Sequence, residues 1–187
     1  PFSVSETFQQ RNTKKSIEES LSLVEEMQSM CEKHDKELVV YLSMAFGNPY
    51  GDVWSEDIVA KWGEKLAKLG VNTLALADTI GVSNADTISR LFSTLIPEFP
   101  EVEWGAHLHT TPDAWREKVE AAYNSGCTRF DSTIKGLGGC PMAKDDLVGN
   151  MPTEKLLSFT QEKKIKTGVN PLTFESAYNK AIDIFGF

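Results

Sequence analysis

Histidine and cysteine are scarce in this sequence, which has only three of each among its 187 residues. An odd number of widely spaced cysteines is not typical of a disulfide framework, so we expect a reducing compartment, the cytoplasm or a mitochondrial matrix. No apolar run approaches the roughly 20 residues that cross a bilayer, and the first residues show no signal- or transit-peptide pattern, so we expect no membrane partner. The net charge of -8 argues against a nucleic-acid partner, because phosphate binding requires clustered Lys and Arg.

Strand-like and helix-like patterns alternate along the chain. Apolar runs predict four strands, at 38–46, 71–77, 102–109 and 127–133, and residues 2–5 resemble the end of another strand. Helical periodicity and capping residues predict helices at 17–31, 55–69, 83–96 and 111–125, and one more that opens at Pro152. Ser16 with Glu19 forms a capping box for the first, and Ser83 and Thr111 are the predicted N-caps of the third and fourth.

This alternation predicts an α/β fold with βα units around a parallel sheet, either an open doubly wound sheet or a (β/α)8 TIM barrel. No Gly-x-Gly-x-x-Gly fingerprint follows a strand. The unusual residues instead follow the ends of several successive strands, which favours the barrel. Only four full βα units can be counted, so we expect the chain to supply about the last four units, the C-terminal half of one catalytic barrel domain.

The end of the third predicted strand carries His107 and His109. Side chains alternate faces along a strand, so both imidazoles are predicted on one face, where they could share a divalent cation. A hard cation also needs oxygen ligands, which Asn150 could supply, although this residue could equally be a helix N-cap. Asp78 follows the second strand and could be an acid, an outer-shell carboxylate or a turn residue.

Cys140 follows a glycine run, Gly136-Leu137-Gly138-Gly139, through which no regular element can pass. It could be a nucleophile, a general acid or a plain loop thiol. Cys31 and Cys127 belong to predicted elements and are expected to be buried small hydrophobic residues. Glu154, in the first turn of a helix, would ordinarily only favour the helix dipole.

At these motifs the chain resembles 3-hydroxy-3-methylglutaryl-CoA lyase, of the metal-dependent lyase and Claisen-condensing superfamily built on the TIM barrel. The most specific segment is Gly136-Leu137-Gly138-Gly139-Cys140-Pro141, which is similar to the signature around the family's catalytic cysteine. Supporting segments are 78–82, the His107-x-His109 pair, 149–150 and 167–170. The resemblance spans the chain from Ser3 to about Asn170.

The resemblance implies an activity and a set of roles. The reaction would be retro-Claisen cleavage of hydroxymethylglutaryl-CoA to acetyl-CoA and acetoacetate, in a homodimer when the protein is full length. His107, His109 and Asn150 would bind Mg²⁺ or Mn²⁺. Cys140 would act in proton transfer, Asp78 and Glu154 would be catalytic acidic residues, and Thr79 would contact the acyl-CoA substrate.

The sequence departs from the family pattern at several positions. Thr110 stands where the family usually has Asp, Lys155 replaces an Asp, and the loop from Cys140 to Asn150 is one residue longer. The family's Arg-Asp pair on the first strand, whose Asp is a metal ligand, falls outside this chain. The alternatives are a Claisen-condensing synthase of the isopropylmalate or homocitrate type, which normally lacks the loop cysteine, and a non-catalytic fragment.

Overall fold

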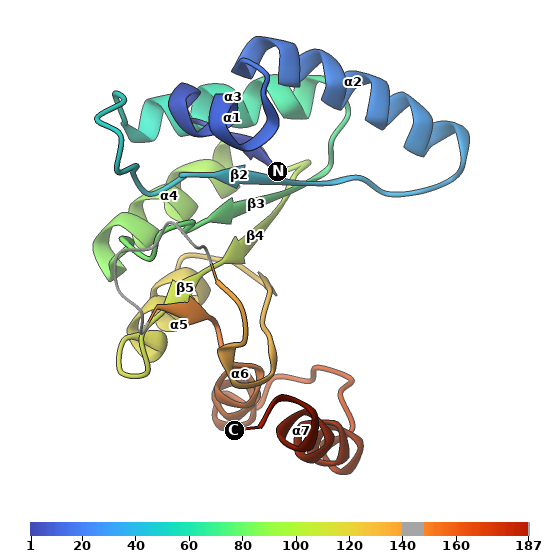
Figure 1. Ribbon diagram of the computed structural model, residues 1–187, viewed down its shortest axis with the longest axis vertical. Coiled ribbons are helices and arrows are strands. Elements are labelled where there is room, and N and C mark those ends of the chain that lie inside the picture. Colours follow the sequence, from blue (N-terminus) through green and yellow to red (C-terminus); the bar gives the residue numbers. More distant parts are fainter. Residues whose placement is uncertain (140–147, 187) are drawn as a thin grey trace.

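A parallel sheet of five strands forms the centre of the molecule, in the order β1-β2-β3-β4-β6. The computed structural model describes residues 1–139 and 148–186. The strands are β1 (Phe2–Ser3), β2 (Val39–Ser43), β3 (Thr73–Ala77), β4 (Glu103–His107) and β6 (Arg129–Phe130). In Figure 1, β2, β3 and β4 fan across the middle of the molecule with their carboxyl ends pointing the same way. A short antiparallel ribbon of β5 (His109–Thr110) and β7 (Gly149–Asn150) lies beyond this end of β4.

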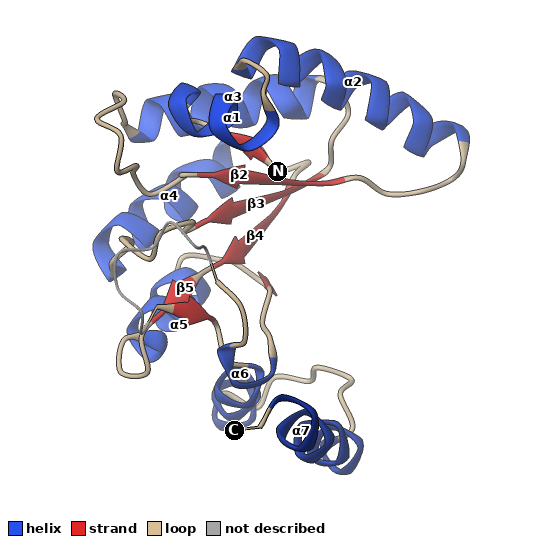
Figure 2. Cartoon of the chain, viewed as in Figure 1, coloured by secondary structure: helices blue, strands red, loops and turns tan. Residues whose placement is uncertain are grey.

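Helices connect successive strands, as the alternation in the sequence predicts. They are α1 (Glu6–Thr13), α2 (Ile17–Lys33), α3 (Glu56–Lys68), α4 (Ala85–Glu98), α5 (Trp115–Asn124), α6 (Thr153–Glu162) and α7 (Pro171–Phe185). Figure 2 shows α1, α2 and α3 along one side of the fanned strands, and α6 and α7 at the bottom of the view, away from them. In the parts of the chain that the structure describes, no helix is long and apolar enough to cross a membrane.

The two faces of the sheet carry different side chains. One face is apolar and buried against the helices, and it includes Leu42, Leu74, Leu76, Trp104 and Ala106. The other face carries small and polar residues in layers. The strand register aligns Tyr41, Ala75, Gly105 and Arg129 in one layer. Two residues further along each strand come Ser43, Ala77, His107 and Asp131, which form the layer nearest the carboxyl ends.

Most predicted elements are present, and the capping box of Ser16 and Glu19 starts α2 as expected. The N-cap of α4 is Asn84 and not Ser83, because Ser83 donates its backbone N–H and its hydroxyl to Asp78. Thr111 does not cap α5: its carbonyl accepts the N–H of Ala114 in a turn that precedes the helix.

All four predicted strands are shorter in the structure. The strand expected at 38–46 is Val39–Ser43, and the strand expected at 71–77 is Thr73–Ala77. The strand expected at 102–109 ends at His107, because the peptide at Leu108 turns to accept the N–H of Met151 and His109 begins β5. The strand expected at 127–133 keeps only Arg129–Phe130 in the ladder. Helices α1 and α7 are additional elements that the periodicity did not predict.

Candidate active site

Two histidines and an asparagine meet just beyond the carboxyl end of β4. The ring centroids of His107 and His109 are 5.4 Å apart, with their planes at 63°. Antiparallel pairing of β5 with β7 sets His109 opposite Asn150, and Nε2 of His109 lies 3.1 Å from Oδ1 of Asn150. The three residues predicted as metal ligands therefore come together, although the two histidines belong to different strands.

The orientation of His109 is held on both sides of its ring. Nδ1 lies 3.0 Å from the carbonyl oxygen of Thr79, which can only accept, so Nδ1 carries the proton. Burial first, and then the neighbouring His107, lower the pKa of His109, which favours the neutral ring. The lone pair of Nε2 then faces Asn150.

Asn150 turns its oxygen toward that lone pair. Its Nδ2 donates to the carbonyl of Leu137 at 2.8 Å, which fixes Oδ1 on the side of His109. Two acceptors therefore face each other at 3.1 Å with no proton between them in the neutral state. Adjacent ligands of an octahedral Mg²⁺ at 2.0–2.1 Å would lie about 3 Å apart, so this pair suits a shared divalent cation.

His107 is oriented by a carboxylate. Its Nδ1 lies 3.2 Å from Oδ2 of Asp131, which follows β6. The bond to His107 is the main reason that the pKa of Asp131 is lowered. Burial and then the hydrogen bond to Asp131 raise the pKa of Tyr41, whose ring meets His107 edge-on at 5.2 Å. With Nδ1 donating to Asp131, Nε2 of His107 is the nitrogen available to a ligand.

The histidines line a cavity of about 260 Å³ at the end of the sheet. Its other walls are Pro1, Tyr41, Ser43, Ala77 and Thr79. The strand ends β2, β3 and β4 thus each supply part of one hollow, as expected where the carboxyl ends of parallel strands meet.

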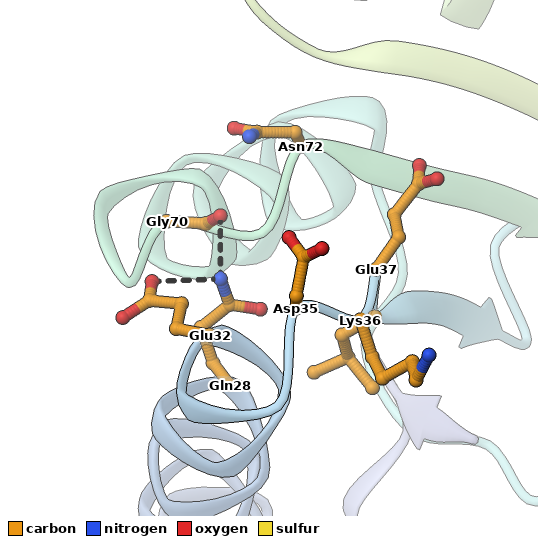
Figure 3. A pocket seen from close by; sticks show the side chains of 8 residues that line it. Gln28, Glu32, Asp35, Lys36, Glu37, Gly70 and Asn72 are labelled. Atoms are coloured by element: carbon orange, nitrogen blue, oxygen red, sulfur yellow. Dashed lines mark hydrogen bonds between the residues drawn. The ribbon is translucent and has the colours of Figure 1, made fainter.

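A second, larger hollow of about 540 Å³ lies at the opposite end of the sheet, where β2 and β3 begin (Figure 3). Gln28 donates there to Glu32 and to the carbonyl of Gly70. Its remaining walls include Asp35, Lys36 and Glu37 and none of the predicted site residues. Of the predicted site residues, His107, His109 and Thr79 line the histidine cavity.

The chain matches the model of the HMGL-like family over residues 2–179. It belongs to the HMGL-like family. It is 34% identical to hydroxymethylglutaryl-CoA lyase of Bacillus subtilis over 90% of this chain and 56% of that protein. It is 35% identical to the zebrafish 3-hydroxy-3-methylglutaryl-CoA lyase, cytoplasmic, over 91% of this chain and 50% of that protein.

A solved HMG-CoA lyase from Acinetobacter baumannii, in complex with coenzyme A and 3-methylmalate, superposes with a TM-score of 0.87. The two chains are 28% identical, and the match covers 99% of this chain and 60% of the other. The chain therefore has part of the TIM-barrel fold of these lyases, as the sequence predicts. It spans about half the length of its curated relatives, but the comparisons do not bear out the expected placement in the C-terminal half.

The other predicted residues of this HMGL-like chain have different surroundings. Asp78 is fully buried and does not line the histidine cavity: it contacts Ser83 and Lys118. Thr79 lines the cavity, but its hydroxyl accepts the N–H of Met44 at 2.7 Å. Cys140 lies outside the described residues.

Glu154 lies beneath the glycine run and not in the histidine cavity. Its carboxylate accepts the backbone N–H of Lys135 at 3.0 Å. The glycines that follow pack closely on β7: a Cβ at Gly136 would come within 2.7 Å of the carbonyl oxygen of Asn150, and one at Gly138 within 3.0 Å of its amide nitrogen. Glycine is required here because the loop backbone lies against the predicted ligand.

Sequence reasoning missed three residues around the site: Tyr41, Asp131 and Lys118. Asp131 directly follows β6 in the structure, but it falls inside the strand predicted at 127–133, which hid its position at a strand end. Lys118 lies on the buried face of α5 beside Val119 and Ala122, where a charged residue is unusual. Tyr41 falls inside an apolar strand and gave no distinct signal.

Proposed function

We propose that the full-length protein cleaves 3-hydroxy-3-methylglutaryl-CoA to acetyl-CoA and acetoacetate, with a divalent cation, Mg²⁺ or Mn²⁺, held by His107, His109 and Asn150. One observation carries this proposal. In an HMGL-like chain, Nε2 of a neutral His109 and Oδ1 of Asn150 face each other at 3.1 Å beside His107. Among the described residues no group of three or more His, Cys, Asp or Glu could hold a metal ion. The proposed set therefore combines the two histidines with the side-chain oxygen of Asn150.

A bound divalent cation would polarise the substrate oxygens and favour loss of the proton from the tertiary hydroxyl. The chain's own residues would prepare that site. Thr79 holds the ring of His109 through its carbonyl, and Asp131 holds the ring of His107. Leu137, on the glycine run, fixes the amide of Asn150.

The reaction needs two proton transfers. A base takes the proton of the tertiary hydroxyl, the carbon–carbon bond breaks to give the ketone of acetoacetate, and an acid protonates the enolate of the released acetyl-CoA thioester. We assign the second step to Cys140, because it follows the glycine run that packs on Asn150. Glu154 would support this loop through Lys135, and Asp78 would act indirectly, since it does not reach the cavity.

The test uses the full-length enzyme with hydroxymethylglutaryl-CoA and measures acetoacetate formation and Mn²⁺ affinity in parallel. His109→Ala should weaken Mn²⁺ binding by more than the roughly 10–100-fold expected for loss of an outer-shell partner, and turnover should fall with it. His34→Ala is the matched control, because His34 is exposed next to the end of α2 and remote from the cavity.

Metal binding and turnover that survive in His109→Ala would remove this site from the mechanism. Metal binding without cleavage, together with condensation of acetyl-CoA with a 2-oxo acid, would favour a synthase. The homodimer also stays a prediction, and light scattering of the full-length protein tests it.

A further inference from the structure

Lys118 is a buried cation beside the histidine cavity. It lies on α5 and is 4% exposed, and it is the one buried Lys or Arg in residues 1–139 and 148–186. Its ammonium group donates to Oδ2 of Asp78 at 2.8 Å, to the carbonyl of His109 at 2.8 Å and to the carbonyl of Gly81 at 3.3 Å. Three acceptors match the three N–H donors of a lysine, so the buried charge is fully hydrogen-bonded.

Asp78, the partner carboxylate, is equally well satisfied. Its Oδ1 accepts the backbone N–H of Ser83, and its Oδ2 accepts the hydroxyl of Ser83 as well as Lys118. The carboxylate is fully buried and is not part of the cavity lining. It is therefore not placed to touch a substrate in the cavity.

The turn that follows β3 holds both histidines through its backbone. The N–H of Asp78 donates to the carbonyl of His107 at 2.9 Å. The carbonyl of Thr79 receives Nδ1 of His109 at 3.0 Å. Lys118 completes this arrangement, because it ties the side chain of Asp78 and the carbonyl of Gly81 to the carbonyl of His109.

A buried ion pair is a poor way to stabilise a fold, since apolar residues of similar size often do as well. Here the pair links the turn after β3, whose Thr79 carbonyl holds the ring of His109, to the backbone carbonyl of His109. We propose that Lys118 is a positioning residue that, through Asp78 and the carbonyl of His109, fixes the His109 imidazole with Nδ1 on Thr79 and Nε2 toward Asn150. This inference rests on the proposed metal site and adds a residue that orients one of its ligands without binding the metal itself.

The experiment compares three variants of the full-length protein. Lys118→Met removes the ammonium but leaves Asp78 buried and unpaired, and it could fail to fold for that reason alone. The double variant Lys118→Met with Asp78→Asn removes both charges and keeps the buried volume. Lys68→Met is the matched control, because Lys68 forms an exposed ion pair with Glu64 on α3.

Two readouts are measured on variants that keep a wild-type melting curve. One is the tautomer of His109 in the metal-free protein, from ¹⁵N shifts of the imidazole nitrogens. The other is Mn²⁺ affinity without substrate. The double variant should show mixed tautomers and about 10–100-fold weaker Mn²⁺ binding, as expected for an outer-shell contact. Lys68→Met should change neither.

A purely structural role predicts a different result. A double variant with the wild-type His109 tautomer and Mn²⁺ affinity within twofold of wild type would overturn the inference. If wild type binds Mn²⁺ and His109→Ala does not, that outcome leaves the proposed function intact. If His109→Ala binds Mn²⁺ as tightly as wild type, the proposed function and this inference fail together.

Discussion

Asp131 connects two side chains of the cavity wall, the ring of His107 and the hydroxyl of Tyr41. A carboxylate on one imidazole nitrogen fixes the ring and directs the other nitrogen toward a ligand. Its pKa is lowered chiefly by the bond to His107, so it is charged at neutral pH and orients the ring throughout the physiological range.

We expect Asp131→Ala to weaken Mn²⁺ binding in the full-length protein by about 10–100-fold, because His107 would lose its orienting partner. Asp131→Asn keeps an acceptor oxygen and should have a smaller effect. Asp113→Ala, in an exposed turn, is the control. Equal Mn²⁺ affinities for wild type and Asp131→Ala, measured by titration, would show that His107 needs no orienting carboxylate.

Cys127 shows how strongly burial changes the reactivity of a thiol. It is fully buried, and burial raises the pKa of its thiol to about 12. Since the thiolate is the reactive form, at pH 8 roughly one molecule in 10,000 would carry it. The structural role predicted for Cys127 from the sequence agrees with this environment.

In a Cys31→Ser, Cys140→Ser double variant, Cys127 should therefore resist iodoacetamide at pH 8 until the protein is unfolded. Mass spectrometry with and without urea gives the extent of alkylation. Rapid alkylation of the folded protein would mean that the thiol is exposed through local opening.

The sequence was sufficient to find the ligand candidates but not the residues that hold them. His107, His109 and Asn150 stand at strand ends, where their residue types are unusual and their spacing is informative. Asp131 is 24 residues from its partner His107, and Lys118 is 9 residues from His109, the partner nearest to it in sequence. Only the packed fold brings these groups together. For the same reason Asp78, a candidate acid in the sequence, turned out to be paired with a lysine from α5.

At the scale of single elements, strand existence was predictable and strand ends were not. The pairing of β5 with β7 takes His109 out of the main sheet, and no local pattern signals a partner 41 residues away. The N-cap of α4 lies one residue later than predicted, because the backbone N–H and the hydroxyl of Ser83 both donate to Asp78. Helix α7, which was not predicted from the sequence, buries only Ala181.

The contact between α3 and β4 depends on a missing side chain. A Cβ at Gly63 would lie 2.7 Å from the ring of Trp104, which is 3% exposed and cannot move aside freely. We expect Gly63→Ala to lower the free energy of unfolding by roughly 1–2 kcal/mol, because overpacking costs about 1–3 kcal/mol and the gain in helix propensity offsets up to about 1 kcal/mol.

Urea denaturation of the full-length protein measures this change, and Lys61→Ala, at an exposed position of the same helix, is the control. A Gly63→Ala variant as stable as wild type would mean that α3 shifts outward without loss of packing.

At the scale of the whole molecule, one face of the sheet is covered by helices and the other is not closed. Within the described residues, β1 pairs only with β2 and β6 only with β4 in the main sheet. The uncovered face carries the layer of His107 and Asp131. In the full barrels of its relatives, such a face becomes the packed interior.

We therefore expect the 187-residue chain, expressed alone, to associate. Edge strands expose unpaired N–H and C=O groups, and α7 adds the exposed side chains of Leu172, Ile184 and Phe185. Light scattering after size exclusion should give a mass that exceeds one chain and rises with concentration, and binding of a hydrophobic dye should exceed that of the full-length protein under the same conditions. The full-length protein is the matched reference, because completing the barrel would cover both edges. A monomer with a single cooperative melting transition at high concentration would show instead that this half of the fold is stable with its edges open.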